Sequence, residues 1–180
     1  MAQDYFDIAA LEEAINATLP GATMFVRDVD LPESMAAMYT DGLIIREKAY
    51  IDASCRVMGM MTSHRYAILL NHMVDLGEFE QDTNWGLCVA QRDSHFKVLG
   101  QHTYDGKTMI VLLHLPDDER WKLFENTRIN IEEEFFDSCC IRFENKCNEP
   151  VIPELATKDW LGRCSFPLGM DDEGNLWDLE

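Results

Sequence analysis

The residues from 61 to 76 constrain the fold of this chain more than any other stretch. Apolar side chains recur there at positions i, i+3, i+4, i+7 and i+10, which is the spacing of one face of an α-helix. Thr62 or Ser63 can cap the start of such a helix, and Gly77 suits the left-handed turn at its end. The pattern therefore predicts a buried central helix over residues 62–76, against which a sheet packs. The side chains on its apolar face are Tyr66, Leu69, Leu70, Met73 and Leu76.

Before this stretch the sequence predicts a helix and a small hairpin. Ile8, Leu11, Ile15 and Leu19 keep a helical spacing that ends at Pro20-Gly21. Two strand-like runs follow at residues 43–45 and 49–51, separated by a short polar segment. We expect these two runs to pair with each other.

After the predicted central helix the composition changes to that of strands, at residues 85–91, 95–104 and 108–113. Asp105-Gly106, between the second and third runs, is a strong hairpin signal because type I′ turns need positive φ. We therefore expect a three-stranded antiparallel meander. Its last strand is a continuous apolar run, which indicates burial on both faces.

The C-terminal third is predicted to be helical. Pro116 and the acidic residues after it suit the first turn of a helix, an apolar stripe runs through residues 129–147, and a short helix fits residues 154–161. The acidic tail over residues 170–180 is either mobile or docked through Leu176 and Trp177. Together the elements predict an α+β fold in one domain spanning residues 1–180.

The charge of the chain limits the partners that it can have. Its 33 acidic and 15 basic residues give a formal net charge of −18 at pH 7. This charge opposes binding to nucleic acid or an anionic membrane and favours basic proteins as partners. The sequence holds no long apolar segment and no signal peptide, and its six cysteines lack a disulfide spacing. We therefore expect a cytoplasmic protein with reduced cysteines.

Patterns that would support catalysis are sparse. His72 and Asp75 lie three residues apart on the predicted helix, where they form an alternative metal site. A histidine flanked by apolar residues is more often part of a core. The sequence contains no phosphate-binding glycine loop, and no residue set has triad spacing. We predict a non-enzymatic protein without a cofactor or a metal, with His72 and Asp75 as the alternative.

The stretch LPESMAAMYTDGLIIREKAYID, followed by TSHRYAILLNHMVDLG, spans residues 31–77. It resembles the ImmA/IrrE metalloprotease-like family found beside phage and mobile-element repressors. In that family a small hairpin precedes a helix bearing an HExxH motif. Asn71, His72 and Asp75 stand here where the first histidine, the glutamate and the second histidine would be. The resemblance implies a catalytically degenerate regulatory protein of a phage or mobile element.

Three acidic runs, interleaved with aromatic side chains, predict a surface that imitates a nucleic acid. The leading hypothesis is an acidic inhibitor that binds a basic nucleic-acid-handling effector, because the chain is similar in size and charge to anti-CRISPR proteins that block Cas nucleases. The alternatives are the degenerate ImmA/IrrE-like protein and an immunity-type binding domain whose acidity serves only solubility. The predicted partner-binding residues are Asp117, Asp118, Glu119, Trp121, Glu132, Glu133, Glu134, Asp171, Asp172, Glu173 and Trp177.

Overall fold

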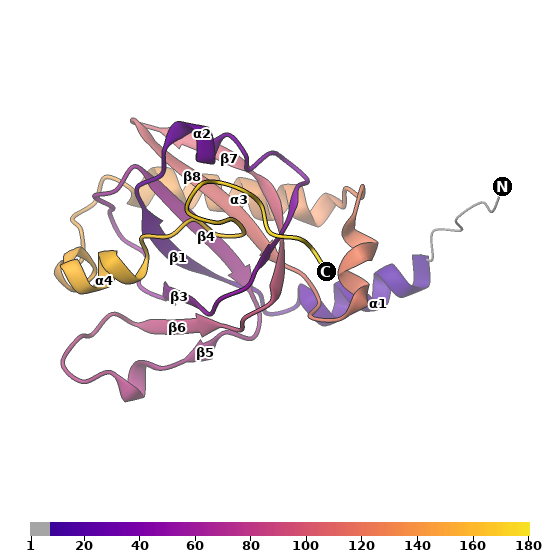
Figure 1. Cartoon of the computed structure of the whole chain (residues 1–180), viewed down its shortest axis with the longest axis horizontal. Helices are drawn as coiled ribbons and strands as arrows, with labels where there is room; N and C mark the ends of the chain where they lie inside the picture. The colour runs from indigo at the N-terminus through magenta and orange to yellow at the C-terminus, as the bar shows by residue number, and fades with distance from the viewer. Residues whose placement is uncertain (1–7) are drawn as a thin grey trace.

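The computed structural model describes residues 8–180, and its main element is one mixed sheet of eight strands (Figure 1). The strand order is β2-β7-β8-β4-β1-β3-β6-β5. The strands are β1 (Thr23–Val29), β2 (Ile44–Glu47), β3 (Ile51–Ser54), β4 (His64–Leu70), β5 (Val74–Asp75), β6 (Leu87–Ala90), β7 (Ser94–Tyr104) and β8 (Lys107–His114). The α-helices are α1 (Ile8–Thr18), α2 (Glu33–Ala36), α3 (Asn130–Lys146) and α4 (Lys158–Arg163), with 3₁₀ turns η1 (Gly77–Phe79), η2 (Glu119–Phe124) and η3 (Pro153–Ala156).

The predicted central helix over residues 62–76 is wrong, because most of this stretch forms strand β4 in the middle of the sheet. β4 pairs with β1 in the antiparallel direction and with β8 in the parallel direction. Every residue of β4 after His64 is buried, so both faces of the strand are covered. Such a strand needs apolar residues at nearly every position, and the helical spacing within it was coincidental. The helix that the ImmA/IrrE resemblance requires is therefore absent.

The two faces of the sheet are covered by different parts of the chain. Helix α3 packs on one face, where Cys139 and Phe143 join the side chains of β1, β4 and β8. The segment after α4 crosses the other face, where Leu168 and Met170 pack against buried side chains of β3, β4 and β7 (Figure 1). All six cysteines are free. No helix of residues 8–180 is long and apolar enough to cross a membrane.

The predicted hairpin and meander are also wrong in their pairing. β2 pairs with β7, and β3 pairs with β1 and β6, so the strands near residues 43–54 do not pair with each other. β7 and β8 do form a hairpin, with Asp105 and Gly106 at φ 49° and 75°. β6 pairs with β3 and β5 instead of completing the meander. The predicted strand pairs join segments that are neighbours in the sequence, whereas most of the observed strand pairs join segments that are far apart in it.

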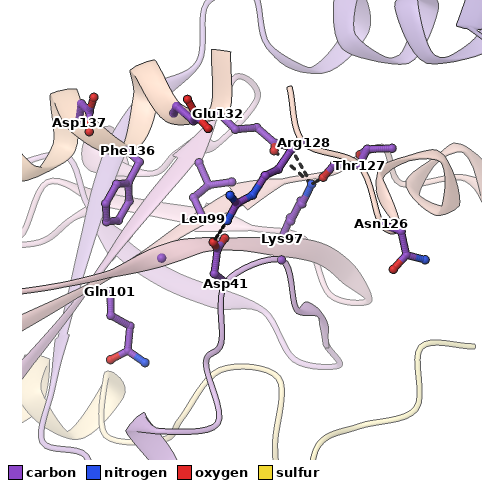
Figure 2. Close-up of a pocket in the computed structure, with 13 residues that line it drawn as sticks. Asp41, Lys97, Leu99, Gln101, Asn126, Thr127, Arg128, Glu132, Phe136 and Asp137 are labelled. Carbon is purple, nitrogen blue, oxygen red and sulfur yellow. Dashed lines mark hydrogen bonds and ion pairs between the residues drawn. The ribbon is translucent and has the colours of Figure 1, made fainter. Parts of the chain in front are cut away.

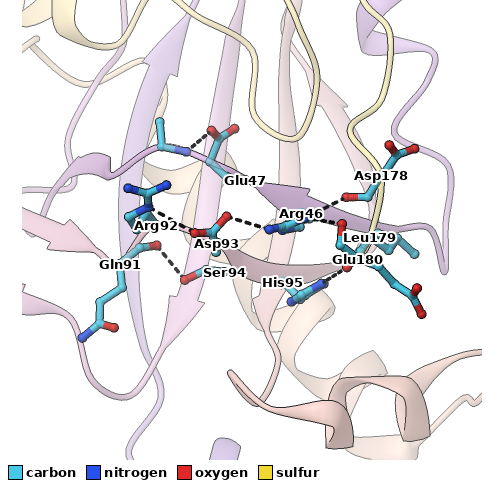
Figure 3. Close-up of polar contacts among 11 residues, drawn as sticks. Arg46, Glu47, Gln91, Arg92, Asp93, Ser94, His95, Asp178, Leu179 and Glu180 are labelled. Carbon is cyan, nitrogen blue, oxygen red and sulfur yellow. Dashed lines mark hydrogen bonds and ion pairs between the residues drawn. The ribbon is translucent and has the colours of Figure 1, made fainter.

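The prediction of a helical C-terminal third is wrong as well, because the described structure has only α3 and the short α4 there, besides 3₁₀ turns. Residues 178–180 run beside β2 and β7 at the edge of the sheet (Figure 3). Arg46 of β2 donates hydrogen bonds to the carbonyl oxygens of Asp178 and Glu180, and Nε2 of His95 bonds that of Leu179 at 2.8 Å. These contacts hold the end of the acidic segment against the sheet.

Candidate metal centre

Three potential metal ligands meet beyond the ends of two neighbouring strands. β4 and β8 are parallel, with Leu69 opposite Leu113, so both strands end at the same edge of the sheet. His114 is the last residue of β8 and Asp117 follows in the next loop, while His72 lies two residues beyond β4. The parallel pairing therefore places side chains from distant parts of the sequence at one site.

The three side chains converge closely. Nε2 of His114 lies 3.1 Å from Oδ1 of Asp117, and Nε2 of His72 lies 3.4 Å from Oδ2 of the same carboxylate. The two imidazole rings meet edge to face, with centroids 4.7 Å apart. One ligand atom of each residue lies within 4.8 Å of the others, the only such cluster in residues 8–180. Since zinc bonds to nitrogen and oxygen are about 2.0–2.2 Å long, a small rotation of the exposed His72 would bring all three atoms within reach of one ion.

A neighbouring amide sets the orientation of His72. Nδ1 of His72 is hydrogen-bonded to Oδ1 of Asn71, and because an amide oxygen can only accept, this nitrogen carries the proton. In the neutral ring the lone pair is then on Nε2, the nitrogen that lies 3.4 Å from the Asp117 carboxylate. The Asn71 amide nitrogen donates to the carbonyl oxygens of Ala17, in the last turn of α1, and of Pro20, just after the helix, at 3.0 and 3.4 Å. Supporting hydrogen bonds of this kind orient metal-binding histidines.

The electrostatics of the cluster suit a cation. Burial lowers the pKa of His114, although the hydrogen bond to Asp117 opposes this effect. The same hydrogen bond holds the pKa of the Asp117 carboxyl below its usual value. At neutral pH the site therefore holds a neutral imidazole beside an ionised carboxylate, and a metal ion would take the place of the proton that lies between them.

His114 and Asp117 also have the composition of an acid–base pair, but the geometry disfavours that role. The second imidazole nitrogen of His114, Nδ1, is buried and has no hydrogen-bond partner within residues 8–180. Its ring packs edge-on against Phe96, with centroids 5.2 Å apart. A substrate cannot reach this nitrogen, so His114 lacks the free basic atom that a catalytic base presents. Nε2, the nitrogen that faces the cluster, is the one that could coordinate an ion, and binding would displace the proton that it donates to Asp117.

The sequence had indicated His72 and Asp75 as the alternative metal ligands. The structure brings His72 to His114 and Asp117, whereas Asp75 is not part of this cluster. Asp75 lies in β5 and accepts a hydrogen bond from the Gly77 backbone at 2.8 Å. No spacing in the sequence links His114 to His72, because only the parallel pairing of β4 with β8 brings the two residues together.

The eleven predicted partner-binding residues are scattered over several environments. Asp117 belongs to the metal cluster. Trp121 is buried and stacks on His95 at a centroid distance of 4.5 Å, and Glu132 is buried against Lys97. Binding of a basic protein, or of a protein–nucleic acid complex, to this surface stays a prediction. The exposed or half-buried members are Asp118, Glu119, Glu133, Glu134, Asp171, Asp172, Glu173 and Trp177.

A separate cavity of about 780 Å³ lies between α3, β7 and the loop at residues 126–128 (Figure 2). The buried Lys97 donates to both carboxylate oxygens of Glu132 at 3.0 and 3.1 Å, and to the carbonyl oxygen of Thr127. Arg128 reaches across the opening and pairs with Asp41. The cavity shares no residue with the metal cluster.

Comparisons with known proteins give only partial similarities of fold. No family model and no curated protein sequence matches the chain. The type III effector XopAI from Xanthomonas axonopodis pv. citri is 10% identical, with a TM-score of 0.47 over 53% of this chain and 42% of its own. ADP-ribosyltransferase HopU1 of Pseudomonas syringae is 16% identical, with a TM-score of 0.46 over 55% and 46%. Exoenzyme S from Pseudomonas aeruginosa is 15% identical, with a TM-score of 0.43 over 58% and 52%. This chain spans about half the length of these proteins.

These findings correct the predicted identity. The similar structures are bacterial effectors and exoenzymes, with an ADP-ribosyltransferase among them, so the prediction of a non-enzymatic, anti-CRISPR-type inhibitor is wrong. The ImmA/IrrE-like and immunity-type alternatives are not supported either. At these identities and TM-scores the similar structures assign no activity to this chain.

Proposed function

We propose that this protein is a metal-dependent enzyme in which His72, His114 and Asp117 bind one divalent transition-metal ion that activates water for hydrolysis. The proposal is carried by the convergence of two imidazole nitrogens and a carboxylate within 4.8 Å. Catalytic zinc sites have three protein ligands and an open position, whereas structural zinc sites have four protein ligands. Two imidazoles with one carboxylate also suit iron and manganese.

The exposure of the cluster is consistent with a site that small molecules can enter. The side chains of His72 and Asp117 are 48% and 50% exposed, whereas that of His114 is 2% exposed. One side of the cluster is thus anchored in the core and the other faces solvent. A bound ion would supply Lewis-acid polarisation of a water on the solvent side. His72, His114 and Asp117 would hold the ion in place, because they lie at or just beyond the ends of the paired strands β4 and β8.

Metal titration tests the ligand set. Protein stripped with a chelator is expected to bind one equivalent of Zn²⁺ in isothermal titration calorimetry. His72→Ala and Asp117→Asn each remove one ligand, and each should weaken binding by about a hundredfold or more. Asp75→Asn and His102→Ala are the matched controls, because both residues lie outside the cluster, and they should bind as the wild type does. Equal affinity in all four variants, or no binding of Zn²⁺, Mn²⁺ or Fe²⁺, would contradict the proposed site.

An activity assay separates catalysis from metal binding. The metal-loaded protein should hydrolyse an activated ester, p-nitrophenyl acetate or bis(p-nitrophenyl) phosphate, faster than both the stripped protein and the Asp117→Asn variant. Stoichiometric binding without metal-dependent hydrolysis of either probe would overturn the catalytic role while retaining the metal site.

Asn71 should affect metal affinity without being a ligand. Asn71→Ala removes the acceptor that fixes the His72 tautomer, so we expect metal affinity to fall by about 10–100-fold. The ¹⁵N NMR chemical shifts of the His72 ring should show loss of the Nδ1–H tautomer in the same variant. Asn145→Ala on the exposed surface of α3 should leave both measurements unchanged. An unaltered tautomer with unaltered affinity would show that Asn71 does not position His72.

A further inference from the structure

The cavity between α3 and β7 has a shape suited to a small ligand. Gly100 lies at the irregularity in β7, and a Cβ atom there would come within 2.8 Å of the Phe136 ring. Because glycine lacks that atom, the ring lies close to the strand, near the buried Leu99 that also lines the cavity. The volume of about 780 Å³ lies within the range of small-molecule sites, roughly 300–1,000 Å³.

The charges that line this cavity are unbalanced. Its two cations are each paired with a carboxylate, as described above. Two further lining carboxylates, Glu133 and Asp137, form no hydrogen bond or ion pair within residues 8–180. They lie four residues apart in α3, and like charges at that spacing repel each other. Both side chains are exposed, so α3 contributes to the lining two carboxylates that have no partner within residues 8–180 and are accessible to a ligand.

We infer that this cavity binds a small organic amine, an aliphatic diamine or polyamine, through Glu133 and Asp137. The ammonium groups would pair with the two carboxylates, while the aliphatic chain would lie against Leu99 and Phe136. An aromatic ring attracts a neighbouring ammonium group, and the net charge of −18 raises the local concentration of cations.

A bare metal ion fits this cavity less well than an organic cation. Glu133 and Asp137 belong to no cluster of three metal-binding groups in the described part of the chain. A single ion would also leave the apolar wall at Phe136 without a contact. This inference is independent of the metal centre, because the two sites share no residue.

The test compares charged and uncharged ligands of the same length. Isothermal titration calorimetry with putrescine and spermidine should show saturable binding of one ligand per chain, whereas 1,4-butanediol should not bind. The double variant Glu133→Gln/Asp137→Asn should weaken putrescine binding by about tenfold or more. The matched control, Asp172→Asn/Glu173→Gln, removes the same charge from exposed residues outside the cavity and should change affinity by less than about twofold.

The outcomes of this comparison are distinct. Selective loss in the cavity variant, with the control intact, supports the amine site. Equal weakening in both double variants would assign the binding to the overall negative charge and overturn the inference. Absence of saturable binding, or binding of a lysine-containing peptide but of neither free amine, would overturn it as well.

Discussion

Lys97→Met is expected to destabilise the protein by about 3–5 kcal/mol, because it leaves a buried carboxylate without its partner. The side chains of Lys97 and Glu132 are only 3% and 7% exposed. The Lys97 ammonium donates hydrogen bonds to both carboxylate oxygens of Glu132 and to the Thr127 carbonyl oxygen. The substitution removes all three of these hydrogen bonds. The free energy of unfolding, measured with urea at neutral pH, should report this loss.

Two comparisons show whether burial causes the loss. Lys146→Met breaks a more exposed pair, with Glu149, at the end of α3, the helix that also carries Glu132; both side chains are more than a third exposed, and the loss should be less than about 1 kcal/mol. The double variant Lys97→Met/Glu132→Met replaces both buried charges with apolar groups and should be more stable than Lys97→Met alone. Equal losses of unfolding free energy in Lys97→Met and Lys146→Met would show that burial does not increase the contribution of the Lys97–Glu132 pair to stability.

Local chemistry in the sequence predicts individual elements of this fold. Asp105-Gly106 marks the turn between β7 and β8 because its backbone needs positive φ, and the structure has that conformation. The spacing of the first apolar residues predicts a helix where α1 forms. Pairing between distant segments leaves no such local mark. The contact of β2 with β7 and the insertion of β4 between β1 and β8 were therefore missed.

The candidate site shows the same limit. His72 stood out in the sequence because it lies three residues before Asp75 on the predicted helix, but this spacing did not identify its actual partners. His114 is 42 positions later in the numbering, and only the parallel register of β4 and β8 brings it close. Asp117 was assigned to an acidic surface because three acids follow Pro116. The hydrogen bond from His114 gives that carboxylate a different role from those of its two neighbours.

Gly59→Ala should destabilise the protein strongly, because the added methyl group would meet backbone atoms. A Cβ at Gly59 would overlap the carbonyl oxygen of Glu149 and lie 2.8 Å from the carbonyl carbon. Gly59 is bridged to Val151, and Arg65 donates to the carbonyl oxygens of Met58 and Gly59 at 2.8 and 3.4 Å. Because both sides of this contact are fixed, relief requires movement of a chain segment. We expect a loss of about 3 kcal/mol in urea unfolding.

The same substitution at Gly162 should have the opposite sign. Gly162 lies in α4 with no atom within 4 Å of an added Cβ, so Gly162→Ala should stabilise the helix by about 0.5–1 kcal/mol. The two variants differ in their surroundings but not in the group added. A Gly59→Ala variant as stable as the wild type would show that the segments at residues 57–60 and 148–151 can separate. The close approach of these segments would then not be needed to hold Arg65 and the end of α3 in place.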